Sequence, residues 1–164
     1  MILFGMSRET SDFWVDCLEI WWEKTKSSCP GIKRLVIYLD NGPSCASNRR
    51  QFIKRLCEFA DKTGLELHLV YYPPYHSKYN PIERVWGILE LHWNGTLLTN
   101  LDVTMKWAAT MTWKGQHPEV RQVDRTYAKG ITLSNKEWKL YERRLLRSAT
   151  LPKWDVTIKP QLPQ

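Results

Sequence analysis

The chain has 164 residues, of which 43% are hydrophobic and 12% aromatic. This composition predicts a folded domain with a hydrophobic core and argues against a disordered protein. The N-terminal apolar run is too short for a signal peptide, and no apolar run approaches the length of a membrane span. We therefore expect a soluble protein.

The formal net charge of +7 is unevenly distributed along the chain. Residues 1–94 contain 12 Lys and Arg against 11 Asp and Glu, whereas residues 95–164 contain 12 against 6. A positive excess favours a polyanionic partner such as nucleic acid. Here the excess lies in residues 95–164, outside the segment that carries the candidate chemistry.

The four cysteines, at positions 17, 29, 45 and 57, have none of the spacings of a zinc site. Cys17 and Cys57 fall on apolar faces of predicted helices, which favours buried thiols. Free thiols suit a reducing compartment, so we expect a cytoplasmic protein.

Strand and helix patterns alternate along the first part of the chain. Strands are predicted for residues 2–5, 34–40 and 65–71, and helices for residues 10–28, 47–63 and 81–93. The run 34–40 is apolar almost without interruption, which predicts a strand buried on both faces. The alternation predicts an α/β fold in which helices cover a largely parallel sheet.

Two of the predicted helices carry a clear apolar stripe. The stripe of helix 10–28 consists of Phe13, Trp14, Cys17, Leu18 and Trp21. The stripe of helix 47–63 consists of Phe52, Ile53, Leu56, Phe59 and Ala60, and Gly64 is placed to end that helix.

The pattern loosens after residue 94. Helices are predicted for 101–113 and for 135–148, the second beginning with a capping box of Ser134 and Glu137, and short strands for 130–133 and 154–158. We expect residues 1–94 to form one domain and residues 95–164 to form a small, basic, mainly helical C-terminal extension packed on it.

Asp40 ends the predicted strand 34–40 and is followed by the turn residues Asn41-Gly42-Pro43. In α/β proteins, ligand sites gather at the carboxyl ends of strands. A carboxylate at this position is well placed to hold a cation, although an aspartate before a turn can equally bond to the turn backbone. Position alone leaves both roles open.

Glu83 lies in the first turn of the predicted helix 81–93, after Asn80 as N-cap and Pro81. A glutamate at this position can hydrogen-bond back to the N-cap backbone, and the helix dipole stabilises its charge. Taken alone, Glu83 gives no evidence of a functional site.

The segments around these two acids resemble catalytic blocks of a known family. YLDNGPSCASNRRQF (38–52) and YYPPYHSKYNPIERVWGILELHWNG (71–95) resemble the second and third catalytic blocks of DDE insertion-sequence transposases, in particular the ISAzo group. LFGMSRETSDFWVDCLEIWWE (3–23) and the stretch from TMTWKGQHPEV to YAKGITLSNKEW (110–138) resemble that group too. The Asn-Pro-Ile-Glu block is the most specific of these motifs.

The resemblance implies a ribonuclease-H-like α/β fold, with a mixed sheet and flanking helices. It also implies that Asp40 and Glu83 are the second and third of three acids that bind two Mg²⁺ (or Mn²⁺) ions. Mg²⁺ prefers oxygen ligands, usually one or two carboxylates with waters and phosphate oxygens. Two such ions can hold the attacking and leaving oxygens of a phosphoryl displacement, here DNA cleavage and strand transfer.

By resemblance, the first acid lies on a strand upstream of residues 2–5. No residue of this sequence fills that place, because Glu9, Asp12 and Asp16 belong to the following turn and helix. We therefore expect an N-terminally truncated catalytic domain that is inactive alone. The implied partners are DNA (transposon ends and target) and a second copy of the chain or a full-length transposase, in the nucleoid.

Further residues are candidates for DNA contacts. His76 and Lys78 lie in the loop before the Glu83 helix, and Arg49 and Arg50 begin a helix whose N-terminal dipole disfavours cations. A solvated loop explains the first pair equally well. A basic face is formed in 136–147 by Lys136, Lys139, Arg143, Arg144 and Arg147, for which a solvated helix surface is the simpler explanation.

Three alternatives to the transposase reading remain. A ribonuclease-H-like nuclease would use the same carboxylates without joining strands. A non-catalytic DNA-binding remnant, or an inhibitor of a full-length transposase, would bind DNA without cutting it. A small-molecule α/β enzyme is disfavoured, because the sequence has no Gly-rich phosphate loop and no G-x-S-x-G motif.

Overall fold

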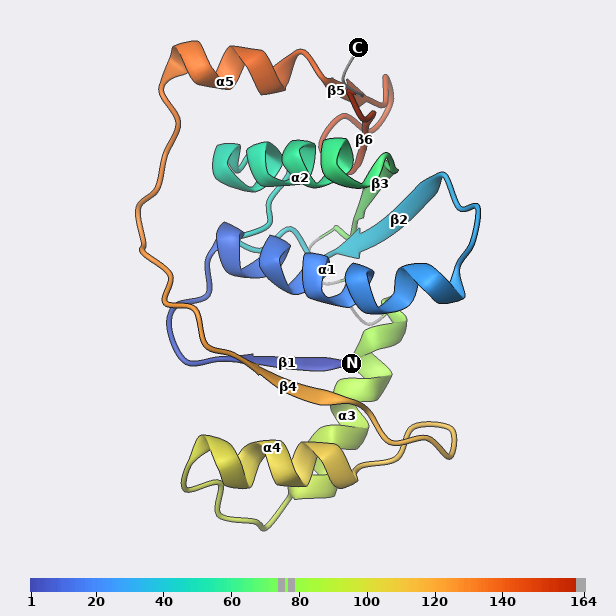
Figure 1. Ribbon diagram of the computed structural model, residues 1–164, viewed down its shortest axis with the longest axis vertical. Helices are drawn as coiled ribbons and strands as arrows, with labels where there is room; N and C mark the ends of the chain where they lie inside the picture. Colours follow the sequence, from blue (N-terminus) through green and yellow to red (C-terminus); the bar gives the residue numbers. More distant parts are fainter. Residues whose placement is uncertain (74–75, 77–78, 162–164) are drawn as a thin grey trace. The chain divides into compact units, whose positions relative to one another are not determined.

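The computed structural model describes residues 1–73, 76 and 79–161 (Figure 1). In this part of the chain the helices are α1 Ser11–Thr25, α2 Arg50–Thr63, α3 Pro81–Trp93, α4 Leu101–Thr110 and α5 Asn135–Glu142. The strands are β1 Ile2–Gly5, β2 Arg34–Leu39, β3 Glu66–Tyr71, β4 Val120–Val123, β5 Leu145–Arg147 and β6 Asp155–Ile158. None of the described helices combines the length and apolar character that a membrane span requires.

The chain divides into two compact units. Unit 1 consists of Met1–Ser7 and Tyr75–Thr126, and unit 2 consists of Arg8–Pro74 and Tyr127–Gln164. Residues 1–94 are thus shared between both units. The domain boundary expected at residue 94 stays a prediction.

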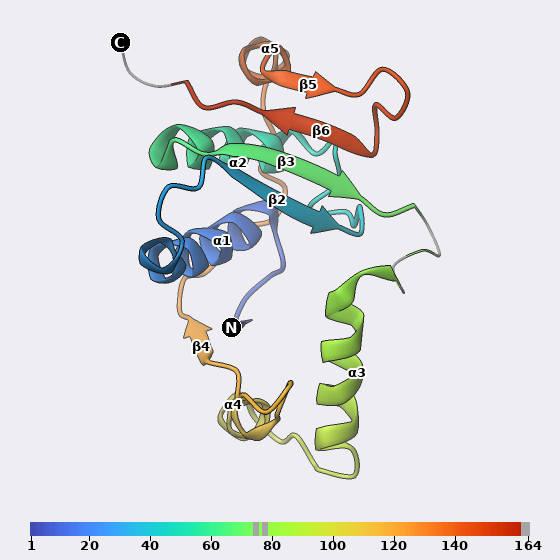
Figure 2. The same ribbon diagram turned by 90° about the vertical axis from the view of Figure 1, so that its right-hand side faces the viewer.

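Unit 2 is built on a four-stranded mixed sheet in the order β2-β3-β6-β5 (Figure 2). β2 and β3 are parallel, with Arg34 opposite Glu66 and Leu39 opposite Tyr71. β6 is antiparallel to both β3 and β5. The fold is therefore mixed α/β as expected, but the sheet is not largely parallel.

Helix α2 packs on this sheet through the stripe expected from the sequence. All five stripe residues, Phe52, Ile53, Leu56, Phe59 and Ala60, are at most 3% exposed. Gly64 ends the helix with a φ of 72°, which only glycine adopts without strain. Each large side chain buried in this way stabilises the fold by about 1.5–3 kcal/mol, more than a surface ion pair contributes.

The buried face of α1 differs from the expected stripe. Val15 and Trp22 are buried, whereas Trp14 is 41% exposed. The reason is that the face turned toward α2 also carries acidic side chains, and Asp12 is only 8% exposed. A stripe defined by apolar residues alone does not identify a buried helix face that also carries carboxylates in ion pairs with a neighbouring helix.

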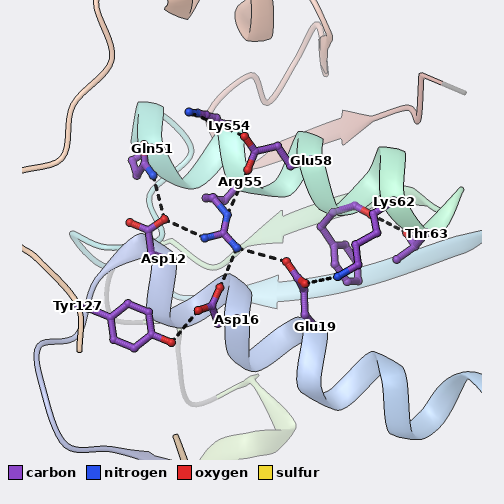
Figure 3. Close-up of polar contacts among 11 residues, drawn as sticks. Asp12, Asp16, Glu19, Gln51, Lys54, Arg55, Glu58, Lys62, Thr63 and Tyr127 are labelled. Atoms are coloured by element: carbon purple, nitrogen blue, oxygen red, sulfur yellow. Dashed lines mark hydrogen bonds and ion pairs between the residues drawn. The ribbon is translucent and has the colours of Figure 1, made fainter. Parts of the chain in front are cut away.

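Arg55 of α2 binds these acidic side chains (Figure 3). Its guanidinium contacts Asp12 at 2.9 Å, Asp16 at 2.7 Å and Glu19 at 3.2 Å, all three on α1. The Tyr127 hydroxyl donates to the second oxygen of Asp16 at 2.8 Å. This network joins α1, α2 and the segment that follows Thr126.

Strand β2 is buried on one face only, which corrects the prediction that 34–40 is covered on both faces. Leu35 and Ile37 pack against the core, whereas Val36 and Tyr38 are 42% and 53% exposed. β2 is an edge strand of the described sheet. Aromatic and β-branched residues suit any pleated surface, so an apolar run does not reveal how many faces are covered.

Unit 1 has a smaller core of its own. β1 and β4 pair in parallel, from Ile2 opposite Val120 to Gly5 opposite Val123. The buried residues of this core are Ile2, Leu89, Ala108 and Met111. His92 of α3 and Thr110 of α4 are hydrogen-bonded at 2.9 Å, so the two helices are joined by a polar contact as well.

The C-terminal part contains more strand than expected. α5 begins with the expected Ser134–Glu137 capping box but ends at Glu142, because Leu145–Arg147 pairs with β6. The strand expected at 154–158 is confirmed as β6, whereas residues 130–133 form no strand. β5 and β6 belong to the same sheet as β2 and β3. The separate, mainly helical C-terminal extension stays a prediction.

Candidate metal centre

Asp40 directly follows β2, at the carboxyl end of the parallel pair β2 and β3. The backbone N–H of Tyr72 donates to the Leu39 carbonyl at 2.8 Å, so the two strand ends are held together up to this point. The Asp40 side chain is exposed. A solvent-accessible carboxylate is thereby fixed at an edge of the sheet where α/β proteins place ligands.

The loop after Asp40 is a defined turn. Asn41 has a φ of 64°, in the left-handed region that asparagine tolerates better than most residues. Its side-chain oxygen accepts a hydrogen bond from the Ser47 backbone N–H at 3.2 Å. Asn41 therefore closes the loop from residue 41 to residue 47.

One oxygen of the Asp40 carboxylate is held by the loop. Oδ1 accepts hydrogen bonds from the Gly42 backbone N–H at 3.0 Å and from the Cys45 thiol at 3.4 Å. A Cβ on Gly42 would lie 3.2 Å from the same oxygen, so a larger residue would press on the carboxylate. Oδ2 has no hydrogen-bond partner among the described residues and is available to a ligand.

Cys45 is itself held in place by Tyr71 at the end of β3. Its side chain is 2% exposed, and its carbonyl accepts a hydrogen bond from the Tyr71 hydroxyl at 3.1 Å. Burial, together with the nearby Asp40 carboxylate, raises the pKa of the Cys45 thiol to about 12. Burial likewise raises the pKa of Tyr71. Both groups therefore keep their protons and remain hydrogen-bond donors at neutral pH.

Two other elements fix the same loop. The Ser11 hydroxyl, at the start of α1, donates to the Ser44 carbonyl at 2.7 Å. Arg147 of β5 donates to the Ser47 carbonyl at 2.6 Å. The loop is thus tied to α1, β3 and β5, and Asp40 is held in a preorganised setting.

Glu83 lies in unit 1, in the first turn of α3. The Asn80 side chain caps this helix by accepting from the Ile82 N–H at 3.4 Å. Within the described residues the Glu83 carboxylate has no hydrogen-bond or ion-pair partner, and it does not reach back to the Asn80 backbone. The capping role considered for Glu83 is therefore not seen among the described residues, and Glu83 is exposed.

The candidate DNA-contact residues have different environments. His76 stacks on Tyr79 with ring centroids 5.9 Å apart, and Lys78 lies outside the described residues. Arg49 is the N-cap residue of α2, and its Nε is buried without a hydrogen-bond partner among the described residues.

Arg50 is engaged within the protein. It donates to the Asn135 side chain at 2.8 Å and lies 5.6 Å from the centre of the Trp138 ring. These contacts hold the start of α5 against α2. The proposed role of Arg50 in DNA binding remains a prediction.

Each of the two carboxylates, taken within its own unit, has the chemistry of a ligand for a divalent cation that prefers oxygen. Asp40 offers one unpaired carboxylate oxygen, and Glu83 offers a carboxylate without a protein partner in the described part of the chain. Mg²⁺ usually takes one or two carboxylates and completes its shell with water and phosphate oxygens. No group of three or more His, Cys, Asp or Glu that could hold a metal ion occurs within the described residues.

Sequence reasoning missed the residues that hold the Asp40 loop. Cys45 had no zinc spacing, and Tyr71 and Arg147 are distant from Asp40 in the sequence. Their contacts depend on the pairing of β3, β6 and β5, which is set by the tertiary fold. The only sequence signal was the position of Cys45 in the turn that follows Asp40.

The comparisons with known proteins agree with the motifs. The family model described as the Rhodopirellula transposase DDE domain matches residues 1–160. No curated protein and no solved structure gave a significant match. The matched range includes the Asp40 loop and the start of α3 with Glu83. Since the match covers nearly the whole chain, the protein belongs to this family of DDE-type insertion-sequence transposase domains.

Proposed function

We propose that the chain carries the second and third acidic residues, Asp40 and Glu83, of a DDE transposase catalytic domain with a ribonuclease-H-like fold. The observation that supports this most directly is the setting of Asp40. One of its oxygens is held by Gly42 and Cys45, and the other is unpaired within the described residues. The Gly42 contact is the turn bond considered for Asp40, and because it uses only one oxygen it is compatible with a ligand role for the other.

In this proposal, the two carboxylates act as ligands and not as nucleophiles. Bound Mg²⁺ or Mn²⁺ supplies Lewis-acid activation of a DNA phosphate and of the attacking water or 3′-hydroxyl. Asp40 presents Oδ2 in a fixed orientation, because its Oδ1 is held by two donors. Glu83 presents a carboxylate on a capped helix end. A carboxylate whose orientation is fixed, as that of Asp40 is, needs little local reorganisation when a metal binds.

The proposal predicts that both carboxylates are needed for metal binding. Asp40→Asn and Glu83→Gln should each weaken Mn²⁺ binding by roughly tenfold or more, since even residues that only orient a ligand change metal affinity by 10–100-fold. The measurement is water-proton relaxation during Mn²⁺ titration. Glu90→Gln is the matched control, because Glu90 is exposed on the same helix α3.

Mn²⁺ affinities of Asp40→Asn and Glu83→Gln equal to those of the wild type and of Glu90→Gln would contradict the assignment. Asp40 would then be a turn residue and Glu83 a solvated side chain.

The proposal also concerns activity. By resemblance, none of Glu9, Asp12 and Asp16 corresponds to the family's first acid, and we propose that residues 1–164 are inactive alone. The assay is joining of a hydroxyl-ended donor DNA to a target in Mg²⁺ or Mn²⁺. Metal-dependent joining by the purified chain would contradict the proposed inactivity, and cutting without joining would favour a nuclease instead.

A further inference from the structure

A pocket of about 310 Å³ lies in unit 2, between the α5–β5 junction and the residues that follow β6. Its lining residues are Arg143, Arg144, Leu146, Lys159, Pro160 and Gln161. Three of the six are cationic and none is acidic. The pocket is separate from the Asp40 loop, and the proposed chemistry makes no use of it.

The cation at the inner wall of the pocket is fixed. Arg144 has a side chain that is only 8% exposed, and it binds both carboxylate oxygens of Asp61. It also donates to the Lys159 carbonyl at 3.1 Å, which fixes the backbone of the pocket's other side. Its Nε is buried without a hydrogen-bond partner in the described part of the chain.

Asp61 is the carboxylate that balances Arg144. Besides Arg144, it accepts a hydrogen bond from the Gln161 backbone N–H at 2.7 Å. Within the described residues its ion pair is with Arg144 and not with either of the two outer cations.

Those outer cations, Arg143 and Lys159, are exposed. Neither has an ion-pair partner among the described residues. The pocket thus holds two uncompensated positive charges beside an apolar wall of Leu146 and Pro160. An anionic group with a carbon skeleton next to its charge matches this combination.

We propose that this pocket binds a phosphate of the DNA backbone, with Arg143 and Lys159 as its cationic contacts. That the polyanion is DNA rests on the proposed function, and it agrees with the positive excess in residues 95–164. The lining contains no Asn and only one Gln, the residues that pair with adenine edges, so the pocket contributes affinity without sequence preference.

The test is DNA binding in the absence of metal, measured by fluorescence anisotropy of a short labelled duplex in EDTA. The double variant Arg143→Ala/Lys159→Ala should bind roughly 5- to 10-fold more weakly at about 0.1 M salt. The slope of log affinity against log salt concentration should become less negative by about 0.9, which corresponds to the loss of one phosphate contact. Arg143→Lys, which retains the charge, should bind nearly as tightly as the wild type.

The control has the same change in net charge. Lys139→Ala/Lys153→Ala removes two exposed cations of unit 2 that do not line the pocket. Its affinity should stay within about twofold of the wild type, with an unchanged salt slope. Arg144 is left intact in every variant, because its bond to Asp61 is structural. Circular dichroism of each variant confirms the fold.

Wild-type affinity and salt slope in the Arg143/Lys159 variant would overturn the proposal, and so would an equal loss in both double variants. A pocket that binds only free anions would show chemical-shift changes at its lining residues when inorganic phosphate is titrated, while the Arg143/Lys159 variant would keep the wild-type DNA affinity. That result would also overturn the proposal. Because EDTA removes metal, Asp40→Asn should bind DNA like the wild type. The pocket and the metal centre can therefore fail independently.

Discussion

The Cys45 thiol is the side-chain donor that the structure shows on the Asp40 carboxylate. Cys45 is buried, and its backbone carbonyl accepts a hydrogen bond from the Tyr71 hydroxyl. Its thiol lies 3.4 Å from Asp40 Oδ1. The Gly42 N–H binds the same oxygen, so the thiol and the backbone together set the rotation of the carboxylate. In metal sites, residues that orient a ligand are important for affinity. Cys45 is therefore a positioning residue for the proposed metal ligand.

Removal of this thiol should weaken metal binding. Cys45→Ala is expected to lower Mn²⁺ affinity by roughly tenfold, since residues that orient a ligand contribute 10–100-fold. Cys45→Ser keeps a donor and should retain most of the affinity. Both are measured by the Mn²⁺ titration used for Asp40→Asn.

Cys29→Ala, at the end of the 3-10 turn after α1, is the control for loss of a thiol. A purely structural role for Cys45 would lower the melting temperature of both Cys45 variants and leave their Mn²⁺ affinities equal. That result would contradict the positioning role.

At the scale of elements, Arg55 organises the contact between α1 and α2. Burial lowers the pKa of Arg55, but hydrogen bonds to Asp16 and Asp12 outweigh it and raise the pKa above its ordinary value. The guanidinium is only 14% exposed and also contacts Glu58 of its own helix at 3.2 Å. Its loss would leave several carboxylates close together without a cation, a costly arrangement in a partly buried site.

Arg55→Ala should therefore destabilise unit 2 by about 3 kcal/mol, the lower end of the cost of breaking a buried ion pair. Arg55→Lys should recover only part of this, because one ammonium does not match the guanidinium's divergent contacts. Urea denaturation followed by circular dichroism gives the free energy of unfolding.

Lys54→Ala serves as the reference for a surface pair. Lys54 contacts Glu58 at 3.8 Å, and its loss should cost less than about 0.5 kcal/mol. If Arg55→Ala were no more costly than Lys54→Ala, the network would contribute nothing to the packing of α1 on α2.

The elements differ in how well the sequence predicts them. α2 and α3 were predicted closely, because the apolar stripe and the Gly64 C-cap of α2 and the Asn80 N-cap of α3 are local signals. β4 and β5 were missed, since VRQV and LLR are too short to show alternation and form only by pairing with distant partners. The same holds for the site. Asp40 and Glu83 follow from motifs, whereas Cys45 and Arg147 act through the tertiary fold.

At the scale of the whole molecule, the two proposed ligands belong to different units with separate cores. Asp40 lies in unit 2, whose core contains Ile53, Leu67 and Val156, and Glu83 lies in unit 1 with Leu89 and Met111. Each carboxylate is therefore held in place by a different hydrophobic core. A substitution in one core should act first on the ligand that this core holds.

Met111→Ala tests this separation. Met111 is fully buried in the small core of unit 1, and truncation of such a side chain costs about 2–5 kcal/mol. Hydrogen exchange should show lost protection in α3, α4 and β4, while β2 and β3 keep theirs, because their core residues are untouched. Mn²⁺ binding should lose its dependence on Glu83 and keep its dependence on Asp40. Equal loss of protection in both units would mean that they unfold as one cooperative block. The Asp40 loop would then depend on the core of unit 1 as strongly as Glu83 does.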